Sequence, residues 1–217
     1  MLILYGHPFS SYTWKAQIAI HANGLAYDFR ILDEDHPENA QFVQQNGGPL
    51  GKFPVLVDGD VVIFEATSII EYLNLHHSGD EKLIPDHDDA AIGMRMLDRV
   101  FDNYVMQIMQ IAVGEHLREG VAPDQTRLSD ARSQLRQSYA WLEGWLAYYP
   151  PTGIITLIEC AAAPSLFYAD WVEQISDEYP KLKQWRTHLL SLPAVSRCVE
   201  AARPYRANFP LGAPDRD

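Results

Sequence analysis

The sequence is poor in cysteine and lacks any long apolar segment. Its 217 residues include two cysteines, Cys160 and Cys198, which form no C-x-x-C motif. This usage predicts reduced thiols and a cytoplasmic protein. No apolar run approaches the ~20 residues that a membrane-spanning helix needs, so no membrane association is expected. The N-terminus, MLILYGHPFSS, has neither the basic leader nor the long apolar core of a signal peptide.

Positive charge is also scarce. The chain has 17 Lys and Arg against 29 Asp and Glu, a net charge of −12 at pH 7. Nucleic acids and anionic membrane surfaces are bound through clustered Lys and Arg, so neither is an expected partner. The adjacent pair His76 and His77 lacks the i, i+4 spacing of a helical metal site, and no metal is expected.

The first 77 residues carry alternating strand and helix signals. Strands are predicted over 2–5, 27–32 and 54–64, the last being a hairpin that turns at Asp58-Gly59. Helices are predicted over 12–22, 37–46 and 67–77. The predicted order is βαβαββα, which describes an α/β domain over residues 1–78.

The rest of the chain has helical signals only. The polar stretch 79–88 is predicted to be a linker, and 89–217 an all-α domain. Apolar residues three and four apart over 94–111 and 135–149 predict two long amphipathic helices. Thr156 and Glu159 form a capping box that predicts a helix start. Beyond Arg203 the chain is rich in proline and is expected to be irregular.

The segment GPLGKFPVLVDGD, residues 48–60, places a proline directly before a strand. Proline cannot donate to a sheet ladder, so Pro54 marks the strand entrance. The residue before a proline is pushed into an extended conformation. Phe53 is therefore expected to present an unpaired main chain, which can pair with an added peptide.

Four segments, in this order along the chain, resemble the cytosolic glutathione transferases. They are PFSSYTWKAQIAI (8–20), GKFPVLVDGD (51–60), FEATSIIEYL (64–73) and TLIECAAAPSLFYAD (156–170). The resemblance covers nearly the whole chain. It implies a thioredoxin-like N-terminal domain, an α-helical C-terminal domain, a homodimer, and glutathione and a small hydrophobic electrophile as substrates. It also implies that Pro54 is cis and that the main chain of Phe53 holds the cysteinyl unit of glutathione.

The start of the first helix is the predicted place of thiol activation. A thiol with a pKa of about 8.5 is only about 3% thiolate at pH 7, and the thiolate is the nucleophile. The residues 10–14 resemble the Ser-Ser-Cys-x-Trp signature of zeta-type enzymes, with Tyr12 in place of cysteine. This implies that Ser10 stabilises the thiolate and that Ser11 and Tyr12 contact glutathione. The residues alone favour helix capping by Ser10 and Ser11. The lack of a cysteine here argues against thiol-transfer chemistry.

The start of the third helix is the predicted binding site for the γ-glutamyl end of glutathione. A helix N-terminus offers free N–H groups to a carboxylate. The resemblance implies that Glu65 binds the amine and that Ala66 and Thr67 bind the carboxylate. Ala66 stands where the family usually has serine or threonine, so one hydrogen bond is missing unless Thr67 supplies it. Lys52 resembles the lysine that reaches the glycyl carboxylate in tau-type enzymes.

Conjugation of glutathione to an electrophile is the predicted function. A glutathione-dependent isomerase or dehalogenase is an alternative, and so is a binding protein without turnover, which Ala66 favours. Along the first long helix, Tyr104, Gln107 and Gln110 are candidates for the second-substrate pocket. Asp98 and the stretch 101–105 are candidates to reach the γ-glutamyl amine across a dimer.

Overall fold

The computed structural model describes residues 1–79, 82–149 and 152–217. Residues 80 and 81 of the predicted linker lie outside this part, so the linker stays a prediction there. The first elements are β1 (Leu2–Gly6), α1 (Ser11–Ala22), β2 (Tyr27–Ile31), α2 (Pro37–Asn46), η1 (Gly48–Leu50), β3 (Val55–Asp58), β4 (Val61–Phe64) and α3 (Ala66–His76). The predicted βαβαββα order is therefore confirmed, with a short 3-10 turn added before β3.

These strands form one mixed four-stranded sheet in the order β2-β1-β3-β4. β1 is parallel to β2 and antiparallel to β3, and β3 and β4 form the predicted hairpin. Its turn uses Gly59 at φ 58°, a left-handed conformation that glycine adopts without strain. In β1, Leu4 is buried in the core shared with α1 and α3. Tyr5 points to the other face, because side chains alternate along a strand, and stacks on Phe42 of α2.

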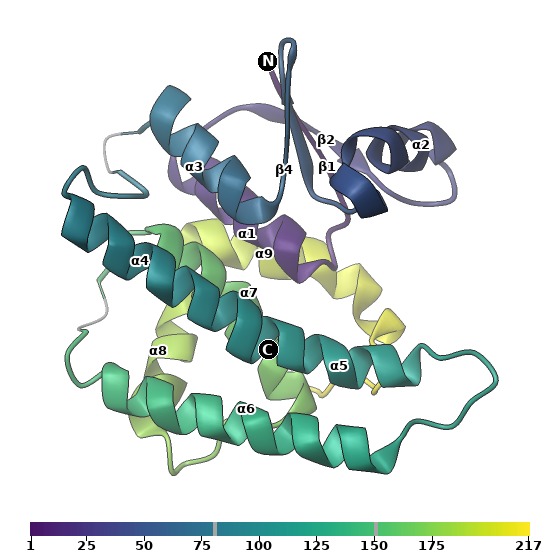
Figure 1. The fold of residues 1–217 in the computed structure, drawn as a ribbon, viewed down its shortest axis with the longest axis vertical. Coiled ribbons are helices and arrows are strands. Elements are labelled where there is room, and N and C mark those ends of the chain that lie inside the picture. Colours follow the sequence, from purple (N-terminus) through teal and green to yellow (C-terminus); the bar gives the residue numbers. More distant parts are fainter. Residues whose placement is uncertain (80–81, 150–151) are drawn as a thin grey trace.

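The second part of the chain is helical and lies beneath the sheet in Figure 1. Its elements are α4 (Asp88–Val100), η2 (Phe101–Met106), α5 (Gln107–His116), α6 (Gln125–Trp145), α7 (Leu157–Val172), α8 (Pro180–Ser191), α9 (Pro193–Ala202) and η3 (Arg203–Asn208). In the described residues no helix combines the length and the apolar character needed to cross a membrane. The tail predicted to be irregular after Arg203 begins with a 3-10 turn and becomes irregular after Asn208.

Helix α7 is the centre of the helical part. All 16 of its residues are buried, and the run Ala161–Ala163 consists of small side chains that allow neighbouring helices to approach closely. The predicted capping box is present: the main-chain N–H of Thr156 donates to Glu159, and that of Ile158 donates to the Thr156 hydroxyl. A buried N-cap of this kind satisfies helix N–H groups that water cannot reach.

The first long helix differs from its prediction at one place. The pattern over 94–111 predicts a single amphipathic helix, but six residues in its middle, η2, are π-helical. The wider turn breaks the 3.6-residue repeat, since a π-helix bonds i to i+5. Tyr104, counted in the apolar seam, is consequently 60% exposed. This irregular stretch faces the candidate site.

Candidate functional site

Three adjoining cavities lie between the strand–helix junctions of the sheet and the helix α4–η2–α5. The helix-start cavity, about 280 Å³, is lined by Tyr12, Gly47, Lys52, Phe53, Pro54, Phe64, Glu65, Ala66, Arg99, Asp102 and Asn103. The central cavity, about 500 Å³, is lined by Ser10, Tyr12, Gly51, Lys52, Phe53, Asp102, Asn103, Gln107 and Gln110. The apolar cavity, about 270 Å³, is lined by Phe9, Ser10, Ser11, Phe53, Met109, Gln110, Val113, Leu117, Tyr168, Asn208, Phe209 and Pro210.

Shared residues join the three cavities into one site. Tyr12, Lys52 and Phe53 line both the helix-start and the central cavity. Ser10 lines both the central and the apolar cavity. The structure thus brings together the predicted site residues from three separate segments, with the exception of Thr67, which lines none of these cavities.

The peptide bond between Phe53 and Pro54 is cis, as the resemblance implies. The ladder between β1 and β3 begins at Val55, so the main chain of Phe53 lies outside that ladder. Among the described residues no main-chain hydrogen bond of Phe53 is found, so its N–H and C=O can pair with another partner at the wall of all three cavities.

Ser10 is the N-cap of α1. It has extended main-chain angles, and its Oγ accepts a hydrogen bond of 3.3 Å from the main-chain N–H of Thr13. Capping uses an oxygen lone pair, and the hydroxyl hydrogen remains available as a donor. The capping and thiolate-stabilising interpretations of Ser10 are therefore compatible.

Tyr12 follows on the same helix turn and has a strongly perturbed phenol. Burial, together with the nearby carboxylates of Asp102, Glu65 and Asp98, raises the pKa of Tyr12 to about 12. The phenol therefore stays protonated at neutral pH and can donate a hydrogen bond to a ligand. It cannot serve as a base under these conditions.

Glu65 is the N-cap of α3 and adopts a left-handed main-chain conformation, with φ 70° and ψ 120°. Such a conformation costs about 1–3 kcal/mol in a residue other than glycine, and it tends to occur at functional sites. The Glu65 side chain makes no capping hydrogen bond. The first N–H groups of α3, from Ala66 onward, are therefore not capped by it and can bind an anion.

The hydroxyl of Thr67 is directed into the protein interior. It is buried and donates to Asp98 over 3.0 and 3.3 Å. The hydroxyl missing at Ala66 is therefore not replaced by Thr67 in this geometry. Only the main-chain N–H of Thr67 remains at the helix start.

A buried ionic cluster behind the cavities was missed by sequence reasoning. Lys15 of α1 is fully buried, and its Nζ lies 2.6 Å from Asp98 Oδ1 and 2.7 Å from Asp102 Oδ1. The carboxylate of Asp102 is 15% exposed and lines both polar cavities. Burial raises the pKa of Asp102, and the ammonium of Lys15 opposes this. Arg99 Nη1 lies 3.4 Å from Asp98 Oδ2 and 3.7 Å from Asp102 Oδ2, so two cations face the two carboxylates and the charges of the cluster balance.

The sequence contains a weak signal for this cluster. Asp98 and Asp102 are four residues apart within a helix that otherwise shows an apolar seam, and Lys15 interrupts an apolar helix. Charges at such positions are buried only when they are paired. The pairing partner, 83 residues or more away, could not be read from the pattern.

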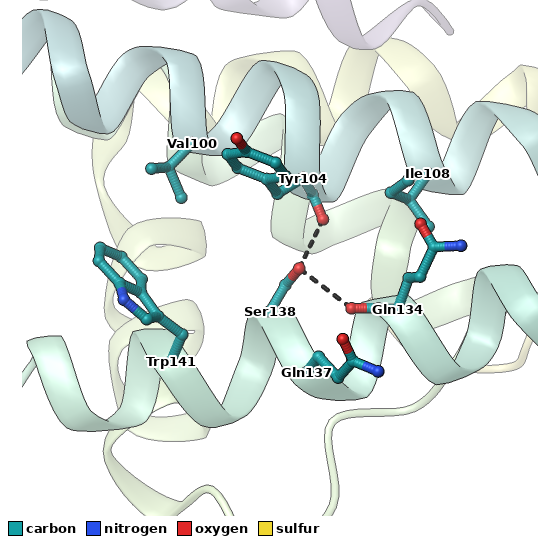
Figure 2. Close-up of a pocket in the computed structure, with 7 residues that line it drawn as sticks. All are labelled: Val100, Tyr104, Ile108, Gln134, Gln137, Ser138 and Trp141. Atoms are coloured by element: carbon teal, nitrogen blue, oxygen red, sulfur yellow. Dashed lines mark hydrogen bonds between the residues drawn. The ribbon is translucent and has the colours of Figure 1, made fainter.

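The second-substrate candidates divide between two places. Gln107 and Gln110 line the central cavity. Tyr104 instead lines a separate groove of about 420 Å³ against α6, with Val100, Ile108, Gln134, Gln137, Ser138 and Trp141 (Figure 2). There the Ser138 hydroxyl donates to the main-chain oxygens of Tyr104 and Gln134, over 2.7 and 3.1 Å. Tyr104 is thus not part of the three-cavity site.

Both cysteines lie in the interior of the protein. Cys160 and Cys198 are both buried, and burial raises the pKa of each thiol, which makes them poor nucleophiles. Among residues 1–79, 82–149 and 152–217, no group of three or more His, Cys, Asp and Glu side chains is arranged to hold a metal ion.

Comparison with known proteins agrees with this architecture. The family model for the glutathione S-transferase N-terminal domain matches residues 4–81. Glutathione S-transferase 1 of Dianthus caryophyllus is 28% identical over 200 residues, covering 84% of this chain and 89% of the relative. A stringent starvation protein A homolog of Coxiella burnetii is 32% identical over 170 residues, covering 77% of this chain and 75% of the relative.

Solved structures share the fold. The glutathione S-transferase of Methylobacillus flagellatus KT, crystallised with GSH bound, superposes with a TM-score of 0.79 at 21% identity, covering 91% of this chain and 98% of that one. The predicted combination of a thioredoxin-like N-terminal domain and a helical C-terminal domain is confirmed. The exact domain limits stay a prediction. By sequence and fold, the chain belongs to the glutathione transferase family.

Proposed function

We propose that the protein binds glutathione in the two polar cavities and joins its sulfur to a small, uncharged, apolar electrophile in the apolar cavity. One observation carries the proposal: Ser10 lines both the central and the apolar cavity. Its hydroxyl therefore lies where a thiol from one side would meet an electrophile from the other.

The polar cavities carry groups that match the ends of glutathione. The carboxylate of the γ-glutamyl unit would bind the N–H groups of Ala66 and Thr67 at the start of α3. Its ammonium would bind Glu65, with Asp102 as a second carboxylate in the same cavity. The main chain of Phe53 would hold the cysteinyl unit, and Lys52 would neutralise the glycyl carboxylate. Tyr12 lines both polar cavities, whereas Ser11 lines the apolar cavity.

Ser10 would lower the pKa of the bound thiol by donating a hydrogen bond to the thiolate. A hydrogen bond to a charged acceptor contributes about 1.5–3 kcal/mol, which corresponds to about one to two pKa units. The N-terminus of α1 adds a favourable dipole. A shift of about two units would raise the thiolate population at pH 7 from about 3% to about three quarters.

The proposed chemical step is nucleophilic displacement. The thiolate forms a carbon–sulfur bond with the electrophile, and the leaving group departs with the bonding electron pair, as chloride does from an aryl chloride. The thiol loses its proton to solvent before the attack, and Ser10 stabilises the resulting thiolate without taking that proton. The polar cavities orient the tripeptide, which raises the effective concentration of its sulfur.

The lining of the apolar cavity argues against an anionic substrate. Among the described residues that line it, none is charged: Phe9, Phe53, Met109, Val113 and Leu117 are apolar, and the polar groups are neutral. A carboxylate placed there would lose hydration without gaining a cation. Isomerisation of an anionic substrate is therefore less well supported than conjugation of a neutral one.

A second candidate is a protein that binds glutathione without turnover. Ala66 favours it, because the helix start lacks a side-chain hydroxyl that would tighten binding. The two candidates share the polar cavities and differ in the use of Ser10.

We further propose a cytoplasmic homodimer. Large apolar side chains remain exposed on α4 and α6, among them Met96 at 55% and Trp141 at 48%. Burying such side chains against a second copy would be favourable. Sedimentation of the purified chain tests this directly: a mass of one chain at micromolar concentration would contradict it.

Two measurements test the proposed function. The protein should be retained on immobilised glutathione and eluted by free glutathione, and it should conjugate 1-chloro-2,4-dinitrobenzene. Retention without conjugation would support the second candidate. Failure of both would contradict glutathione binding itself.

A further inference from the structure

The segment after α9 forms one wall of the apolar cavity. Asn208, Phe209 and Pro210 line that cavity opposite residues of α5 such as Met109 and Val113. The ring of Phe209 is 5% exposed and lies edge-on to Trp171, with centroids 5.1 Å apart. In Figure 1 this segment, in yellow, passes behind α5. The position of Phe209 therefore helps to set the width of the cavity.

Arg206 joins the two ends of this segment. Its Nη1 lies 2.6 Å from Asp217 Oδ1, and its Nη2 donates to the main-chain oxygens of Pro214 and Arg216, the latter over 2.8 Å. Its guanidinium also lies over the Trp171 ring, 4.8 Å from the centroid. One planar side chain thus fixes both ends of residues 207–216, with Phe209 between them.

A second contact attaches this segment to α7. Arg216 Nε lies 3.0 Å from Asp170 Oδ2, and its Nη2 donates to the main-chain oxygen of Asp170 over 2.9 Å. Asp170 is buried, and its other carboxylate oxygen accepts from the N–H of Ile175. The segment is therefore held against α7, whose residues are all buried.

Arg203 provides a natural comparison. It forms an ion pair with the same Asp217, at 2.6 Å, and with Glu200. In the described chain, however, its side chain bonds only to those two carboxylates. Its side chain is 44% exposed, and exposed pairs of this kind contribute little.

We propose that Arg206 is a positioning residue that clamps residues 207–216, so that Phe209 forms a fixed wall of the apolar cavity and limits the size of the electrophile. This inference rests on the proposed function for its consequence in catalysis. Without the clamp, Phe209 leaves the wall for part of the time. A small electrophile then loses contacts, and a larger one gains room.

The kinetic test compares Arg206→Gln with Arg203→Gln. For Arg206→Gln we expect the KM for 1-chloro-2,4-dinitrobenzene to rise about tenfold, as for loss of one wall of an apolar pocket, while the KM for glutathione stays within about twofold. Arg203→Gln should leave both values unchanged. The inference is overturned if the two variants behave alike, or if Arg206→Gln raises both KM values together.

A substrate pair tests the role of Phe209. Phe209→Ala should favour 1-chloro-2,4-dinitronaphthalene over the smaller dinitrobenzene relative to the unmodified protein, and Arg206→Gln should shift preference in the same direction. An unchanged preference in both variants would contradict a wall function. Arg206→Lys keeps the charge but loses the planar fork, so its preference between the two substrates should lie between those of Arg206→Gln and the unmodified protein.

Hydrogen exchange separates this inference from the proposed function, because it needs no activity. Within the segment, the N–H of Phe209 donates to the main-chain oxygen of Arg206, and the N–H of Gly212 donates to that of Phe209. Arg206→Gln should accelerate exchange at both amides and leave those of α7 unchanged. If the protein does not conjugate, the proposed function fails and exchange still decides the clamp. Unchanged exchange in Arg206→Gln would refute the clamp while leaving conjugation intact.

Discussion

The hydroxyl of Thr67 on α3 donates to the carboxylate of Asp98 on α4 over 3.0 Å. This bond commits the hydroxyl to the buried cluster around Lys15, away from the helix-start cavity. Ala66, which does line that cavity, has no hydroxyl of its own. The helix start is therefore equipped with main-chain donors but lacks a side-chain donor from either residue.

Ala66→Ser should tighten glutathione binding. The new hydroxyl would donate a hydrogen bond to the γ-glutamyl carboxylate. A hydrogen bond to a charged acceptor contributes about 1.5–3 kcal/mol, which corresponds to a gain of about tenfold or more in affinity. Isothermal titration calorimetry measures the change. Thr67→Val is the matched control and should leave affinity almost unchanged. The opposite result, in which Thr67→Val weakens binding strongly and Ala66→Ser has no effect, would show that the Thr67 hydroxyl donates to the ligand.

Glu65→Gly should separate stability from binding. Glycine accepts the left-handed conformation at residue 65, so relief of strain should raise the free energy of unfolding by about 1 kcal/mol, after the entropy cost of glycine. The same change removes the proposed ammonium partner and should weaken glutathione binding. Glu65→Ala should weaken binding equally but bring no gain in stability. Denaturant unfolding and calorimetry on both variants check this, and unchanged affinity in both would exclude Glu65 from the binding site.

Lys15→Met should destabilise the fold strongly. It removes the buried cation of Asp98 and Asp102 and leaves beside them only the more distant, exposed Arg99. Breaking a buried pair by removing one partner costs about 3–5 kcal/mol. Lys183→Met is the control, because Lys183 pairs with the exposed Asp177 and should change the free energy of unfolding by less than about 1 kcal/mol. Equal effects of the two substitutions in urea unfolding would contradict a structural role for the Lys15 cluster.

The sequence was most informative where local rules and the final fold agree. The turn at Gly59, the Thr156–Glu159 capping box and the strand entrance at Pro54 each follow from the chemistry of one or two residues. These features, with the family resemblance, were enough to predict the element order and most walls of the polar cavities.

The features that escaped prediction depend on distant partners. The ion pair of Lys15 with Asp102 joins residues 87 apart, and its burial cannot be read from either segment alone. The π-helical stretch η2 keeps an ordinary amphipathic pattern in sequence, although it turns Tyr104 outward. Phe209 lies in a proline-rich tail that carries no periodic signal, and its place in the apolar cavity depends on contacts with α7.

The most direct test of the central claim is the pKa of the glutathione thiol in the bound state. The ultraviolet absorbance of the thiolate, followed across pH in the complex, gives this value for the parent protein, Ser10→Ala and Tyr12→Phe. A donor to the thiolate lowers the thiol pKa, so its removal in Ser10→Ala should raise that pKa by about one to two units. The phenol of Tyr12, with its own pKa raised to about 12, stays protonated throughout the range, and Tyr12→Phe should change affinity with little effect on the thiol. An unchanged thiol pKa in Ser10→Ala, with a rise in Tyr12→Phe, would contradict the account.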